Sequence, residues 1–139
     1  MTNVLVKSKN SGSYQQEVKT NSHTFVADVN AASGGTEAGP DPHELLLGAL
    51  GACTSITLQM FAKRRGWELK DVTVNLTEEK VDDPENPGRQ ISKITRQIEV
   101  KGDLNQEQIE ALGVAADKCQ IHKLLTGSKK IESKVKNAG

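Results

Sequence analysis

The chain has 139 residues, a common size for a single domain, so we expect one domain over residues 1–139. Its 18 basic residues balance its 18 acidic residues and are spread along the chain, which disfavours nucleic acid as the main partner. The N-terminus has no apolar run of the signal-peptide type, and the longest apolar stretch, residues 45–50, is too short to span a bilayer. We therefore expect a cytoplasmic protein that does not bind membranes.

The N-terminal segment, residues 3–29, predicts a small antiparallel meander. Residues 3–9, 15–20 and 23–29 resemble strands, and turn signals rich in Asn, Ser and Gly separate them. Residues 30–40 contain three glycines but lack the Lys and Ser/Thr that complete a phosphate-binding loop. We interpret them as a flexible connector.

Residues 41–65 predict a long helix. Asp41 can cap it, Pro42 suits the first helical position, and Glu44 completes a capping box. Three cations in the last turn and Gly66 after it are typical of a helix end. Apolar residues cover much of the circumference of this helix, so we expect a central element that a partner subunit covers.

The second half of the chain predicts a hairpin followed by helices. Residues 69–80 and 91–100 alternate in hydropathy, and the polar segment 82–88 provides the turn. Residues 103–117 predict a helix capped by Asp103 or Asn105. A short helical or turn segment over 121–127 and a closing strand over 129–135 complete an α+β chain.

The chain contains two cysteines, Cys53 and Cys119. Cytoplasmic thiols are kept reduced, so a pair of them is more typical of redox chemistry, catalysis or metal binding than of a structural disulfide. A lone Cys53 on an apolar helix face would usually be a small core residue, but Cys119 supplies a possible resolving thiol. A thiolate that attacks a peroxide becomes a sulfenic acid, which a second thiol condenses to a disulfide.

A buried cysteine in the middle of a helix needs help to ionise. Burial raises the pKa of a thiol, and Cys53, in the middle of its helix, gets no help from a helix N-terminus. Arg64 and His43 lie roughly 17 Å and 15 Å away along the helix, which is too far. We therefore expect a cation from a partner subunit or from elsewhere in the fold, for which the N-terminal meander offers four candidates: Lys7, Lys9, Lys19 and His23.

A zinc site is an alternative to a redox pair of thiols. Cys119 and His122 have a spacing found in zinc sites, and Cys53 and His43 could complete the ligand set. Cys53 stands alone in its helix, however, so we predict no metal and no cofactor. His122 is then a polar neighbour of the second thiol or a surface residue, and Glu44 is a helix cap rather than an acid–base catalyst.

Residues 35–53, with Pro42, the Glu44-Leu45 pair and then Cys53, resemble the OsmC/Ohr superfamily of osmotically inducible and organic hydroperoxide resistance proteins. The resemblance continues through Cys119 and His122 and covers nearly the whole chain. It implies an OsmC-like α+β fold, with antiparallel sheets around long central helices. It also implies an intertwined homodimer with two active sites where the subunits meet.

The resemblance further implies a thiol-dependent hydroperoxide reductase of the oxidative stress response. Cys53 would be the peroxidatic thiol and Cys119 the resolving thiol, and a dithiol, often a lipoyl protein in this family, would be the reductant. Two positions differ. His43 stands where peroxidase members have an acidic residue ten positions before the first cysteine, and no arginine precedes Arg64, although the family's catalytic arginine is N-terminal. Glu44, His43 and His122 are therefore only supporting candidates, and a non-enzymatic dimer that binds a small apolar ligand or senses redox state is the alternative.

Overall fold

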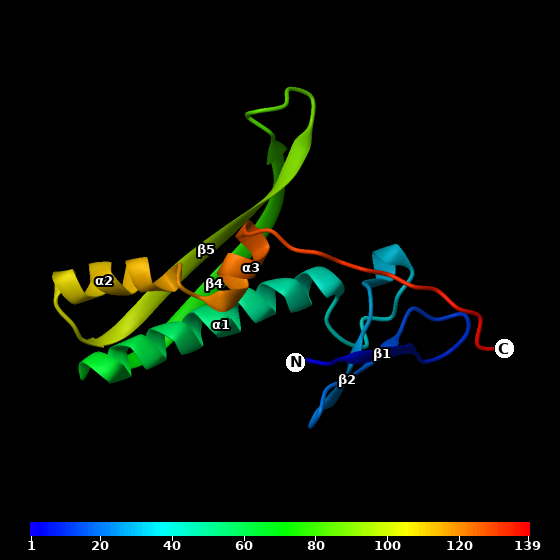
Figure 1. Ribbon diagram of the computed structural model, residues 1–139, viewed down its shortest axis with the longest axis horizontal. Coiled ribbons are helices and arrows are strands. Elements are labelled where there is room, and N and C mark those ends of the chain that lie inside the picture. The colour runs from blue at the N-terminus through cyan, green and yellow to red at the C-terminus, as the bar shows by residue number, and fades with distance from the viewer. The chain divides into compact units, whose positions relative to one another are not determined.

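A computed structural model describes all 139 residues, which form two compact units, residues 1–49 and 50–139. The first unit contains β1 (Leu5–Ser8), β2 (Gln16–Lys19), β3 (Thr24–Ala27), the 3-10 helix η1 (Ala31–Ser33) and the start of α1 (Pro42–Arg65). The second unit contains the rest of α1, then β4 (Glu68–Asp82), β5 (Gln90–Asp103), α2 (Gln106–Ala116) and α3 (Gln120–Thr126) (Figure 1). A single domain over residues 1–139 stays a prediction.

The three N-terminal strands form the predicted antiparallel meander, in the order β1-β2-β3. The loop after β3 is anchored by Asp28, whose side chain is buried. Its carboxylate accepts hydrogen bonds from the backbone N–H groups of Val29, Thr36 and Ala38 and from the Thr36 hydroxyl. These bonds, those from Ala38 and Val29 above all, lower the pKa of Asp28 from 3.8 to about 2 although its burial raises it. The connector over residues 30–40 is thus held by hydrogen bonds to the buried carboxylate of Asp28.

Both predicted ends of α1 are confirmed. The Asp41 N–H donates to Glu44 Oε1 over 2.9 Å, and the Glu44 N–H donates to Asp41 Oδ1 over 2.8 Å, which is the predicted capping box. At the other end Gly66 has a φ of 70°, a left-handed conformation that favours glycine. The Trp67 N–H then closes the last turn on the Ala62 carbonyl, so the helix ends where its sequence predicts.

The second unit is built on the predicted hairpin. β4 and β5 pair in antiparallel register from Glu68–Asp103 to Asp82–Gln90. Figure 1 shows α1 and α2 running along this hairpin, with the hairpin tip projecting beyond them. Between these elements lies a core whose fully buried members are Leu58, Ala62, Leu112, Ala115 and Ala116. The fully buried part of this core is therefore aliphatic, and Phe61 and Trp67 pack against it.

The predicted closing strand is wrong: residues 129–135 form no strand. Ile131 and Val135, the two apolar residues of this segment, are 83% and 98% exposed. A strand is stable only beside another strand, and no strand of this chain pairs with this segment. Nearby, α2 is shorter than predicted and is capped by Asn105, the second of the two expected candidates.

α1 leaves much of its apolar surface uncovered. Leu46, Ile56 and Met60 are 41%, 50% and 58% exposed. By length and composition the helix could cross a membrane, with a mean hydropathy of 1.6 over its most apolar window, which is 22% buried. The longest uninterrupted apolar run, residues 45–50, is much shorter than this helix and does not indicate its membrane-spanning length. One such helix is weak evidence for a span, because core helices of soluble proteins have the same character.

A candidate thiol site

The structure brings Cys53 and Cys119 together. α1 presents Cys53 in a half-buried position, whereas Cys119 is fully buried. Cys119 is the N-cap of α3, and its Sγ accepts a hydrogen bond from the His122 N–H over 3.4 Å. The Cys119 thiol is near enough to Cys53 to lower its pKa as a hydrogen-bond donor. Both cysteines are free thiols, and they differ in exposure.

The surroundings of Cys53 favour its thiolate. Burial raises the pKa of Cys53, but hydrogen bonds from the Cys119 thiol and from the Ile121 backbone N–H outweigh it, with smaller contributions from Thr57 and Gln120. The net pKa is lowered. This corrects the expectation that Cys53 gains no help from a helix N-terminus, because the donors come from the first turn of another helix, α3.

An arginine that was not predicted as a site residue contacts the residues that flank both cysteines. Arg96 of β5 is 13% exposed and donates from Nη1 to Thr54 Oγ1 over 2.9 Å and from Nη2 to Asp117 Oδ1 over 2.9 Å. It also contacts His122 Nδ1 at 3.4 Å. The alternation along β5 could have indicated Arg96, because position 96 lies on the same strand face as the partly buried Ile94, Ile98 and Val100. A charged residue on an apolar strand face is unusual enough to mark a site.

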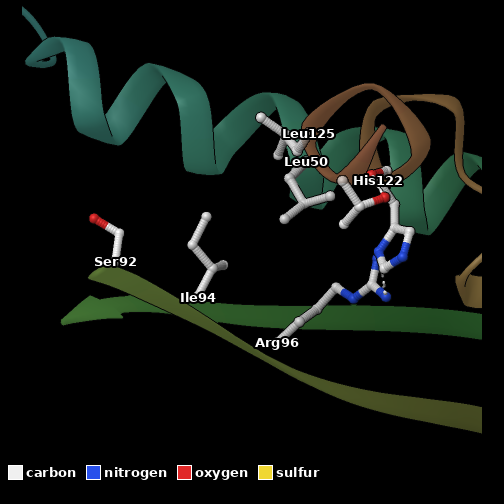
Figure 2. Close-up of a pocket in the computed structure, with 7 residues that line it drawn as sticks. Leu50, Ser92, Ile94, Arg96, His122 and Leu125 are labelled. Carbon is white, nitrogen blue, oxygen red and sulfur yellow. Dashed lines mark hydrogen bonds between the residues drawn. The ribbon is translucent and has the colours of Figure 1, made fainter. Parts of the chain in front are cut away.

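A cavity of about 470 Å³ adjoins this arginine. In Figure 2, Arg96 and His122 point toward one another at one end of the cavity, and Leu50 and Leu125 lie across from Ile94. Ser92 and Thr126 complete the lining. The cavity therefore combines a polar end with an apolar body.

The remaining predicted site residues are placed differently. Glu44 and His43 belong to the first turn of α1, in the N-terminal unit, and the Glu44 carboxylate bonds the Asp41 N–H as a cap. His122, by contrast, belongs to the thiol site through its backbone and its ring. No group of three or more His, Cys, Asp or Glu side chains is arranged to hold a metal ion.

Comparison with known proteins identifies the family. The OsmC family profile, described as OsmC-like protein, matches residues 34–134, which include both cysteines, Arg96 and His122. The chain belongs to the OsmC family. No curated protein matches it.

Solved structures share the α+β OsmC fold, with antiparallel sheets and helices. An OsmC-like protein from Mycoplasma pneumoniae matches with a TM-score of 0.74 at 16% identity, over 91% of this chain and 88% of that one. The organic hydroperoxide resistance protein OhrB of Bacillus subtilis matches at 0.63 and 23% identity, over 91% of both chains. An organic hydroperoxide resistance protein OsmC from Legionella pneumophila matches at 0.66 and 18% identity, over 90% of both. At these identities the likeness establishes the OsmC fold.

Proposed function

We propose that this OsmC-family protein is a thiol-dependent hydroperoxide reductase of the oxidative stress response. The observation that carries the proposal is the proximity of two free thiols of which one, Cys53, has a lowered pKa. The names of the B. subtilis and L. pneumophila proteins, which specify organic hydroperoxide resistance, support it. An organic hydroperoxide would be the substrate and a dithiol, such as a lipoyl protein, the reductant.

The difference in exposure between the two cysteines supports separate roles as peroxidatic and resolving thiol. Cys53 is half-buried, so a peroxide can reach its sulfur, whereas Cys119 is 0% exposed and can react only with its neighbour. The lowered pKa gives Cys53 the thiolate that attack on a peroxide needs. Cys53 is therefore the peroxidatic thiol and Cys119 the resolving thiol.

The reaction proceeds in three balanced steps. The Cys53 thiolate attacks one peroxide oxygen, the O–O bond breaks, and the departing alkoxide takes up a proton to leave an alcohol and a Cys53 sulfenic acid. The Cys119 thiol attacks that sulfur, an S–S bond forms, and its proton leaves with the hydroxyl as water. An external dithiol then reduces the disulfide by exchange and is itself oxidised to a disulfide.

We further propose that the protein acts in the cytoplasm as a homodimer, with no nucleic acid or membrane partner. The exposed apolar residues of α1, Leu46, Ile56 and Met60, support a second copy of the chain as the cover of this helix. Light scattering of the purified protein tests the dimer, and a monomer at micromolar concentration would contradict it.

Steady-state turnover of cumene hydroperoxide with dihydrolipoamide tests the enzyme proposal. The wild type should turn over and Cys53→Ser should be inactive, whereas Cys119→Ser without dithiol should consume about one equivalent of peroxide and stop, because no thiol is then present to resolve its sulfenic acid. Gln59→Ala, on an exposed part of α1, should retain wild-type activity. Absence of turnover in the wild type, or full turnover in Cys53→Ser, would refute the proposal.

The cavity favours a second candidate function, binding of a small apolar ligand by a non-enzymatic dimer. Its volume of about 470 Å³ falls in the range of ligand pockets, and Leu50, Ile94 and Leu125 give it an apolar lining. Ile94→Trp would fill the cavity. Loss of binding of an apolar probe in this variant, combined with a Cys53 pKa above about 8.5 in the wild type, would favour this alternative over the peroxidase.

A further inference from the structure

We propose that Arg96 is a positioning residue for the thiol pair, which fastens the turn that carries Cys119 to the part of α1 that carries Cys53. This inference rests on the proposed function, in which the two thiols form a redox pair. It concerns a residue in the middle of β5, opposite Leu76 of β4, and therefore in a different element from either cysteine.

The contacts of Arg96 reach both sides of the pair. On one side, its Nη1 donates to the hydroxyl of Thr54, the residue next to Cys53, and Thr54 is fully buried. On the other side, it donates to the Ala116 carbonyl over 3.4 Å and to the Asp117 carboxylate, both shortly before Cys119. It also contacts the ring of His122, which follows Cys119 in the chain (Figure 2). One guanidinium thus links α1 to the chain before and after the resolving cysteine.

Stability alone does not explain a charge at this position. The Asp117 side chain is 67% exposed, and ion pairs with a solvated partner contribute little to folding. An aliphatic residue at position 96 would continue the face formed by Ile94 and Ile98. What an aliphatic residue cannot supply is a planar group that donates in several fixed directions at once, which is the property that distinguishes arginine.

The chemistry of Cys53 depends on the segment that Arg96 fastens. The two hydrogen bonds that favour its thiolate most come from Cys119 and the Ile121 N–H, and a smaller one comes from the Gln120 N–H, all in that segment; Thr57 of α1 supplies the remaining one. A disulfide also requires the two Cα atoms to lie within about 7 Å of one another. If the segment moved away from α1, Cys53 would lose its two strongest donors and its partner thiol together.

Disulfide formation with diamide tests this role without any peroxide. Diamide takes two electrons and two protons from the thiols and leaves the Cys53–Cys119 disulfide. Arg96→Met should slow this step about tenfold and raise the midpoint of the pH profile for Cys53 alkylation by about one unit, since one pKa unit is a tenfold change in thiolate. Arg96→Lys should recover part of the rate, and Arg89→Met in the exposed hairpin tip should match the wild type.

A second variant decides the matter if Arg96→Met does not fold. Asp117→Asn changes an exposed side chain and should shift the rate and the alkylation profile in the same direction, by a smaller factor. A wild-type rate and profile in folded Arg96→Met, or in Asp117→Asn where Arg96→Met is unfolded, overturns the inference. Because the assay needs no hydroperoxide, a wild type that lacks peroxidase turnover would refute the proposed function and leave this test intact.

Discussion

Replacing Cys119 separates the chemistry of its thiol from its structural role at the start of α3. Its Sγ caps the helix by accepting from the His122 N–H, and the side chain is fully buried. Serine keeps an acceptor at this position, whereas alanine removes it. We therefore expect Cys119→Ser and Cys119→Ala to lose the Cys53–Cys119 disulfide equally but to differ in stability.

The size of the difference follows from the cap. Removal of an N-cap acceptor costs about 1 kcal/mol, and loss of one buried methylene-sized group adds about 0.8 kcal/mol, so Cys119→Ala should lose about 2 kcal/mol. Cys119→Ser keeps the cap but buries a hydroxyl in place of a thiol, for which we expect a loss of about 1 kcal/mol. The serine variant should then be more stable than the alanine variant by about 1 kcal/mol, or about 4 °C in Tm.

Thermal and urea unfolding of the reduced proteins, followed by circular dichroism, measures this gap. Mass analysis after treatment with cumene hydroperoxide measures the chemistry, and both variants should accumulate oxidised Cys53 without an intramolecular disulfide. Equal stability of the two variants, or a more stable alanine variant, would refute the capping role of Cys119. A difference between them in oxidation chemistry would refute the separation of the two roles.

Three further outcomes are expected, each read from urea unfolding. Leu58→Ala should lower the free energy of unfolding by about 2–5 kcal/mol, because its fully buried side chain leaves a cavity between α1 and α2. Gly66→Ala should cost about 1 kcal/mol, because its φ of 70° is unfavourable for alanine. The pKa of Asp28 falls from 3.8 to about 2 on folding, so its carboxylate should stabilise the protein above about pH 4. This contribution should be lost as the pH falls toward 2, and Asp28→Asn should lack this pH dependence.

Matched variants control these outcomes. Leu124→Ala, at a position 54% exposed, should change stability by no more than about 0.5 kcal/mol. Gly48→Ala lies inside α1 with open space around it and should stabilise the helix by up to about 1 kcal/mol, the opposite sign to Gly66→Ala. Stabilisation by Gly66→Ala, or an acid-unfolding curve of Asp28→Asn that matches the wild type, would contradict the reasoning.

Much of the fold could be predicted from local patterns. The box of Asp41 and Glu44, the stop at Gly66 and the alternation in β4 and β5 all act between residues close in sequence, so each carries its own evidence. The same is true of the motif that ends at Cys53, from which the family resemblance follows. The elements that failed, such as the strand over 129–135, were those whose stability depends on a distant partner.

By itself, then, the sequence indicated the elements other than the strand over 129–135 and the two thiols to consider. The tertiary structure alone decided how those thiols are activated: the strongest donors to Cys53 lie at the start of α3, more than 60 residues later in the chain, and Arg96 reaches both cysteine-bearing segments from β5. No local pattern encodes such contacts, because a hydrogen bond between distant segments depends on how the whole unit packs. The arginine that the family resemblance placed near the N-terminus is absent there, and packing brings Arg96 to the residues that flank the two cysteines.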